Sequence, residues 1–163
     1  MAELRFPTGK IIKAAADLAT NDAVEMANKL LSSGFNGYIA VTARSKNGFE
    51  EGYAAFNEGK ITAASYYNYK NNFSFQGKEA LARVENALAG NGVFDIVELT
   101  TEQVNAAVEL SGTEKFNTSA LQKVEFTEDF ETEARQIETQ QPQQKDEKQE
   151  LLKKYGLTSL SGE

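Results

Sequence analysis

The first strongly periodic stretch of the chain runs from Asp22 to Ser33. Its apolar residues recur at helical spacing and share one face: Val24, Ala27, Leu30 and Leu31. Asp22 and Glu25 form a capping pair at the start, and Gly34 follows the end, where glycine commonly terminates helices. The pattern therefore predicts an amphipathic helix over this stretch.

A two-residue alternation replaces the helical spacing over residues 37–44, as a half-buried strand requires. Asn47-Gly48 and Asn57-Glu58-Gly59 then mark two tight turns, because asparagine and glycine tolerate positive φ. We expect three antiparallel strands in this region, over residues 37–45, 50–56 and 60–67.

Residues 77–89 return to helical spacing, and residues 93–99 alternate again. Thr100 and Gln103 have the capping-box spacing that opens a third helix, whose apolar face carries Val104, Ala107 and Val108. These elements predict an α+β fold in which an antiparallel meander sheet of about four strands packs with three helices. Two N-terminal stretches stay open: residues 4–6 as a short strand, and residues 10–18 as a helix or an irregular arm.

Composition divides the chain into three parts. Most aromatic residues precede Gly112, so we assign the core to an α+β domain over 1–112. Residues 113–144 are acidic and rich in glutamine, which predicts a flexible linker. Residues 145–163 regain a short amphipathic helical pattern and end in a tail.

Charge and missing residue types narrow the function. The 163 residues include no cysteine and no histidine, so the usual thiolate and imidazole chemistry is absent. We therefore expect no enzyme, no catalytic residue, no bound metal and no cofactor. The net charge of −7 disfavours a nucleic-acid partner. Without a signal-like or membrane-spanning apolar run, the expected location is the cytoplasm, away from the membrane.

Two local motifs invite a functional interpretation. Gly34-Phe35-Asn36-Gly37 has the G-x-x-G form of some RNA-binding loops, but its position favours a plain connection from helix to strand. An aromatic cluster surrounds Lys70 and consists of Tyr66, Tyr67, Tyr69, Phe73 and Phe75. Its members can fill the core, form a protein-contact surface, or stack on nucleic-acid bases or a small ligand. We select Tyr66 and Tyr69 as candidate partner-binding residues.

The carboxylates Glu50 and Glu51 are adjacent on a predicted strand, so they need not converge, and we expect them on solvated faces. The terminal helix offers a second candidate contact through Leu151, Leu152 and Tyr155. It can bind a groove on a partner or fold back onto its own domain.

Several segments of the chain resemble an uncharacterised archaeal domain family: Gly37-Tyr38-Ile39-Ala40-Val41, Glu51-Gly52-Tyr53-Ala54-Ala55-Phe56, Gly59-Lys60-Ile61-Thr62-Ala63-Ala64 and Gly77-Lys78-Glu79-Ala80-Leu81. The resemblance extends over about residues 30–112. That family is in turn similar to the PATAN domain, the N-terminal domain of PatA-type bacterial response regulators, which serves protein contacts in signalling. The resemblance implies a fold and a signalling role, and it transfers no catalytic residue.

We therefore hypothesise a non-catalytic adaptor that binds another cytoplasmic protein in a signalling or assembly complex. The alternative is a small-ligand sensor with a pocket between the sheet and the helix at 77–89, and with Tyr66 or Tyr69 at its mouth. The oligomeric state stays open: the exposed edges of a meander sheet favour a weak homodimer, whereas the acidic charge favours a soluble monomer.

Overall fold

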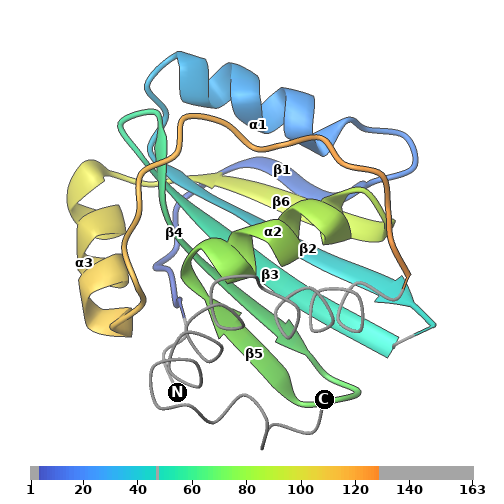
Figure 1. The fold of residues 1–163 in the computed structure, drawn as a ribbon. Helices are drawn as coiled ribbons and strands as arrows, with labels where there is room; N and C mark the ends of the chain where they lie inside the picture. The colour runs from blue at the N-terminus through green and yellow to red at the C-terminus, as the bar shows by residue number, and fades with distance from the viewer. Residues whose placement is uncertain (1–3, 47, 129–163) are drawn as a thin grey trace, which may run out of the picture. The chain divides into compact units, whose positions relative to one another are not determined.

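The computed structural model describes residues 4–46 and 48–128. These residues form one six-stranded sheet in the order β1-β6-β2-β3-β4-β5, with every neighbouring pair antiparallel (Figure 1). The strands are β1 (Lys10–Asp17), β2 (Gly37–Ser45), β3 (Gly48–Asn57), β4 (Lys60–Asn68), β5 (Phe73–Gln76) and β6 (Asn91–Glu98). Three helices accompany them: α1 (Ala23–Ser32), α2 (Gly77–Leu88) and α3 (Thr101–Ser111). The predicted α+β class and antiparallel sheet are confirmed.

The prediction of about four strands is wrong, because neither edge strand of the sheet, β1 or β5, was predicted. β1 lies in the stretch for which a helix or an irregular arm was expected. Nearly all of its residues are exposed, so its sequence carries no alternation of apolar and polar positions. β5 has only 4 residues and leads straight into α2. Residues 4–6 form no strand, although Leu4 is buried.

Capping hydrogen bonds confirm the predicted starts of two helices, α1 and α3. The Asp22 carboxylate accepts a hydrogen bond from the Glu25 N–H at 3.0 Å at the start of α1. At the start of α3, the Thr100 hydroxyl accepts from the Gln103 N–H at 3.1 Å, and the Gln103 side chain accepts from the Thr100 N–H at 2.9 Å. These bonds satisfy N–H groups that the first helical turn leaves without partners.

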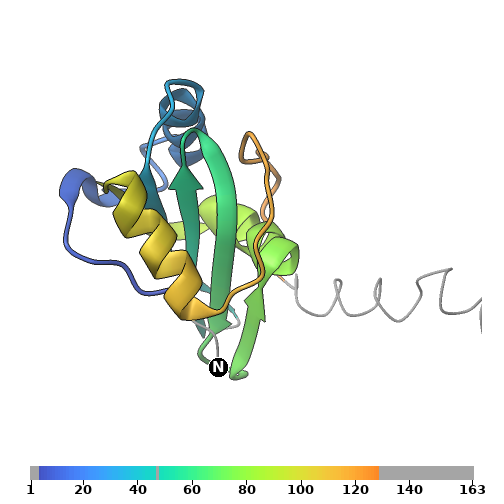
Figure 2. The same ribbon diagram turned by 90° about the vertical axis from the view of Figure 1, so that its left-hand side faces the viewer.

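Helices cover both faces of the sheet (Figure 2). α1 and α2 pack on one face around a core that includes the fully buried Phe56 and Phe94. On the opposite face, Val104 and Val108 of α3 pack with Leu4 over the sheet. The molecule is thus layered, with the sheet between α3 and the pair α1 and α2.

Glu50 contradicts the expectation of a solvated carboxylate. Its side chain is 6% exposed and accepts a hydrogen bond from the Tyr66 hydroxyl at 2.8 Å. Alternation along β3 places Glu50 on the same face as Phe56, under α2. A buried carboxylate requires such a donor, because burial without a hydrogen bond strongly disfavours its charged form.

The first compact unit extends to Glu128, past the predicted domain boundary at 112. We name residues 113–128 the strap (orange in Figure 1). Leu121 of the strap is 3% exposed and belongs to the core under α1 and α2. The remainder of the predicted linker and all of residues 145–163 lie outside the described residues.

Glu85 of α2 gives the strap contact a predictable pH dependence. Burial raises the pKa of its carboxyl above the ordinary 4.5, against the opposing effect of the Gln122 N–H. A raised pKa means that ionisation opposes folding as pH rises through it. Glu85→Gln should therefore match the parent's melting temperature near pH 4 and exceed it by a few degrees near pH 8.

Thermal melting between about pH 4 and pH 8 measures this difference. The control Glu79→Gln changes an exposed carboxylate on the same helix and should show no such trend. A Glu85→Gln protein that melts below the parent near pH 8 would show that the bond from Gln122 outweighs the effect of burial.

Candidate interaction surface

Among the described residues, α3 covers only part of its face of the sheet. Its apolar side chains pack over Ala55, Ala63 and Val97 near one end of the strands. Toward the other end, cross-strand neighbours on this face are exposed or half-buried: Thr42 opposite Glu51, Glu51 opposite Tyr67, and Arg44 opposite Phe49. This half of the sheet is therefore an accessible surface on rigid strands.

A cluster of three tyrosines surrounds one carboxylate on this surface. We name Glu51, Tyr53, Tyr67 and Tyr69 the tyrosine cluster. The hydroxyls of Tyr53 and Tyr69 each donate a hydrogen bond to a different oxygen of Glu51. The rings of Tyr67 and Tyr69 meet edge to face, with centroids 4.7 Å apart. These contacts fix the orientation of the rings before any partner binds.

Two phenols of this surface, those of Tyr53 and Tyr38, are held in the protonated form at neutral pH. Burial, and then the hydrogen bond to Glu51, raise the pKa of Tyr53 above its ordinary 10.0. Burial and the charge of Asp95 also raise the pKa of Tyr38. A phenolate nucleophile is thereby disfavoured, and the hydroxyls act as hydrogen-bond donors.

Cations border the aromatic residues. The Arg44 guanidinium lies 5.6 Å from the ring centroid of Phe49, which is 53% exposed. Lys70 Nζ donates to the Lys46 carbonyl oxygen at 3.3 Å, which brings a second positive charge to this end of the sheet. A partner would meet exposed aromatic rings next to positive charge.

A second aromatic group continues the surface toward α3. Phe6 stacks on Tyr38 with centroids 4.1 Å apart and planes 8° from parallel. Tyr38 in turn lies 6.4 Å from Tyr53 between ring centroids. Because Tyr53 belongs to the tyrosine cluster, the two groups form one continuous row of rings.

The structure separates the two tyrosines predicted to bind a partner. Tyr66 is 4% exposed and points into the core toward Glu50, whereas Tyr69 is 53% exposed within the tyrosine cluster. The other candidates, Leu151, Leu152 and Tyr155, lie outside the described residues.

Sequence reasoning missed Arg44, Phe49 and Tyr53 in this surface, together with Phe6 and Tyr38 of the second aromatic group. Alternation along β3 was a usable signal, since Phe49, Glu51 and Tyr53 occupy every second position and share one face.

The predicted ligand position between the sheet and residues 77–89 is closely packed where Gly52 meets Val84. A Cβ atom added to Gly52 would lie 2.7 Å from Val84 Cγ2, so α2 contacts the backbone of β3 directly. Clefts lie elsewhere, among them a small one of about 180 Å³ between β4, α3 and the start of the strap. The Thr62 hydroxyl oxygen faces this region and has no hydrogen-bond partner among the described residues.

Within residues 4–46 and 48–128, no group of three acidic side chains converges as a metal site. None of the helices in this part of the chain has the length and apolar character needed to cross a membrane.

Fold and surface together define a class of protein: a small α+β domain whose antiparallel six-stranded sheet packs against two helices on one face and leaves aromatic side chains accessible on the other. Residues 4–111 match the model of a family described as an uncharacterized protein conserved in archaea (DUF2226), and the chain belongs to this family. The predicted resemblance to an uncharacterised archaeal family is thereby confirmed. No curated protein and no solved structure matches the chain.

Proposed function

We propose that this protein is a non-catalytic interaction module that acts as an adaptor in a cytoplasmic signalling or assembly complex. The accessible half of the sheet carries the proposal, because Phe49 and Tyr69 are each 53% exposed next to Arg44. Aromatic residues and arginine are the types that dominate the energetics of protein interfaces. Phe49 and Arg44 lie on paired strands, and the Tyr69 N–H, directly after β4, donates to the Phe49 carbonyl oxygen at 3.0 Å. This backbone support limits the entropy lost on binding.

The resemblance to the PATAN domain supports a signalling setting, since that domain serves protein contacts. We further propose that Leu151, Leu152 and Tyr155 provide a second contact with the partner. A tethered second contact strengthens binding through effective concentration and needs no enlargement of the first interface.

The proposal predicts that Phe49→Ala combined with Tyr69→Ala weakens partner binding at least about tenfold. The partner is first recovered with the parent protein from native cell extract, then purified and titrated against each variant. Both side chains are largely exposed, so the melting temperature should change little.

Leu110→Ala is the matched control, because Leu110 is 89% exposed on α3 and lies outside the tyrosine cluster. It should leave the dissociation constant unchanged. Unaltered binding of the double variant, or an equal loss in the control, would exclude the sheet face as the interface. The same titration with alanine at Leu151, Leu152 and Tyr155 measures the second contact separately.

A further inference from the structure

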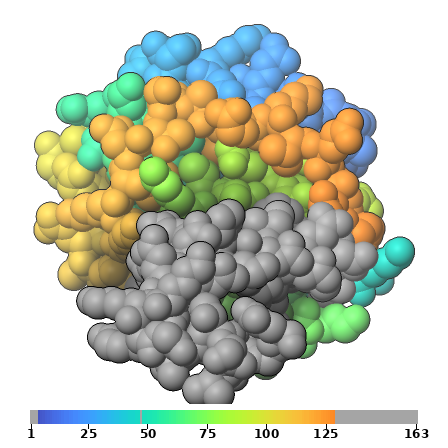
Figure 3. All heavy atoms as spheres, in the orientation of Figure 1, coloured from blue at the N-terminus to red at the C-terminus, as the bar shows by residue number. Residues whose placement is uncertain are grey.

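The strap lies between α1 and α2 (Figures 1 and 3). Hydrogen bonds from helix side chains to its main chain hold it there. Asn28 of α1 donates to the Leu121 carbonyl oxygen at 3.0 Å and accepts from the Leu121 N–H at 2.8 Å. Asn86 of α2 makes the same pair of bonds with Thr127, at 3.1 and 2.9 Å. Each asparagine thus pairs with the strap as a neighbouring strand would.

Other bonds to the strap also use its main chain. The Glu85 carboxylate accepts a hydrogen bond from the Gln122 N–H. Thr118 pairs with Ile61 through bonds of 2.7 and 3.0 Å in the manner of a β-bridge. Backbone groups of almost any residue can make these bonds. Two polar side chains of the strap add to them: Lys123 Nζ lies 2.7 Å from Asp22 Oδ2, and the Glu128 carboxylate accepts from the Lys46 N–H at 3.0 Å. The polar part of the contact therefore recognises chiefly an extended main chain.

The apolar part of the contact rests on three anchors at five-residue intervals, Phe116, Leu121 and Phe126. Leu121 is buried among core residues, and Phe116 packs against the same core. The Phe126 ring lies over Gly90, where an added Cβ would be only 2.9 Å from the ring. Together, Asn28, Ile61, Glu85, Asn86 and Gly90 form what we name the strap site.

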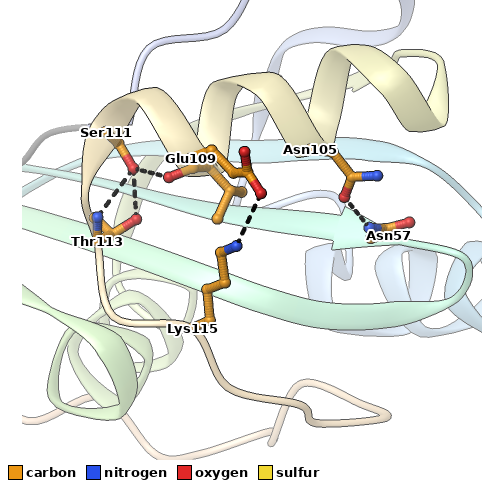
Figure 4. A network of polar contacts seen from close by, with 7 residues as sticks. Asn57, Asn105, Glu109, Ser111, Thr113 and Lys115 are labelled. Carbon is orange, nitrogen blue, oxygen red and sulfur yellow. Dashed lines mark hydrogen bonds and ion pairs between the residues drawn. The ribbon is translucent and has the colours of Figure 1, made fainter.

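A short turn connects the strap to α3 (Figure 4). Gly112 ends α3 with a φ of +67°. Ser111 Oγ accepts from the Thr113 N–H at 3.1 Å, and an exposed ion pair joins Lys115 to Glu109 at 3.4 Å. These bonds are local to the corner, so α3 can persist when the strap leaves its site. The family match also ends at residue 111, before the strap.

We propose that the strap site is a docking site for an extended segment of a partner protein with apolar residues at five-residue intervals, and that the strap occupies this site in cis until the partner segment displaces it. The strap supplies the evidence for this chemistry, because it is itself such a segment. The site lies on the opposite face of the sheet from the tyrosine cluster and is therefore separate from the sheet-face interface.

Tethering determines when a partner segment can enter. A short tether gives the strap an effective concentration on the order of 1 mM at its own site. A free peptide with the same contacts therefore competes poorly with the intact strap and binds well once the strap is weakened. This competition makes the site regulatable, since the partner must bind more tightly than the strap does.

The test uses the full chain with the strap weakened by Leu121→Ala, or in a second host by Phe126→Ala. The probe is a fluorescein-labelled peptide of residues 113–128. Fluorescence anisotropy should show saturable binding to both hosts, at least about tenfold tighter than to the parent. Adding Asn86→Ala should weaken binding about tenfold through the loss of two hydrogen bonds. A peptide with serine at the three anchors should not bind.

The proposal is overturned if a host with the parent's circular dichroism leaves the probe unbound at about 1 mM, or if the serine peptide binds equally well. Should neither host fold, hydrogen exchange in the parent decides. The N–H groups of Leu121, Gln122 and Thr127 should exchange at least about tenfold faster than those of β2 and β3. Equal protection would mean that the strap opens only with global unfolding, and this also overturns the proposal. The sheet-face interface is tested separately by its own variants.

Discussion

Gly37→Ala should destabilise the folded protein by about 3–5 kcal/mol, a large fraction of the stability that folded domains typically have. Gly37 begins β2 with a φ of +152°, a conformation that residues with a side chain rarely adopt. A Cβ atom added there would lie 2.0 Å from the Val97 carbonyl oxygen of β6. Since both atoms belong to paired backbones, neither can move away without breaking the β2–β6 ladder.

Chemical denaturation of the purified variant measures this loss. Gly34→Ala is the matched control at the other end of the same connection, with a φ of +84° and no atom within 4 Å of an added Cβ. It carries the strain of positive φ without the clash and should cost only about 1 kcal/mol. Equal losses for the two variants would contradict the assigned role of the Val97 contact.

Phe56→Ala should lower the free energy of unfolding by about 3–5 kcal/mol. Phe56 is 0% exposed on β3, and its ring meets that of Phe35 edge to face at 6.2 Å. Truncation removes this apolar area and leaves a cavity between the sheet and α1, which close packing on both sides prevents from collapsing. Urea denaturation monitored by circular dichroism gives the measurement.

Phe49→Ala makes the same chemical change on the same strand and serves as the control. Because Phe49 is 53% exposed, the loss there should stay below about 1 kcal/mol. Comparable losses in the free energy of unfolding at the two positions would contradict the difference in burial between the two sides of β3.

Local signals in the sequence predicted the elements whose ends are marked by capping or turn residues. Asp22 and Thr100 cap their helices as expected, and Gly48 and Gly59 turn the chain with positive φ. The two edge strands had no such signals. The pairing of β1 with β6 contains two register shifts, and Ala15 within β1 has a φ of 45°. The side chains of β1 therefore do not alternate with a two-residue period.

Burial of Glu50 and Tyr66 could not be predicted from either residue alone. A carboxylate on a strand is usually solvated, and only the position of α2 over this part of β3 and β4 places both side chains in the core. The register then brings Tyr66 opposite Gly52, close enough for its hydroxyl to reach Glu50.

The strap was also not predictable from its amino-acid composition. Its contacts are made mainly by main-chain atoms and by three widely spaced apolar side chains, while most of its remaining residues are polar. Such a segment has the composition of a linker, and the residues that bind it, Asn28 and Asn86, lie on helices far away in the sequence. Only the tertiary structure brings them together.

The order of strands in the sheet also constrains how the chain folds during synthesis. β2, β3 and β4 are joined by tight turns, so this meander has low contact order and can form as soon as it is made. β1 is made first, yet its pairing partner is β6, whose residues 91–98 come much later. The N-terminal residues must therefore wait, unpaired, until β6 has joined β2, and we expect β1 to close the sheet in one of the last steps of folding.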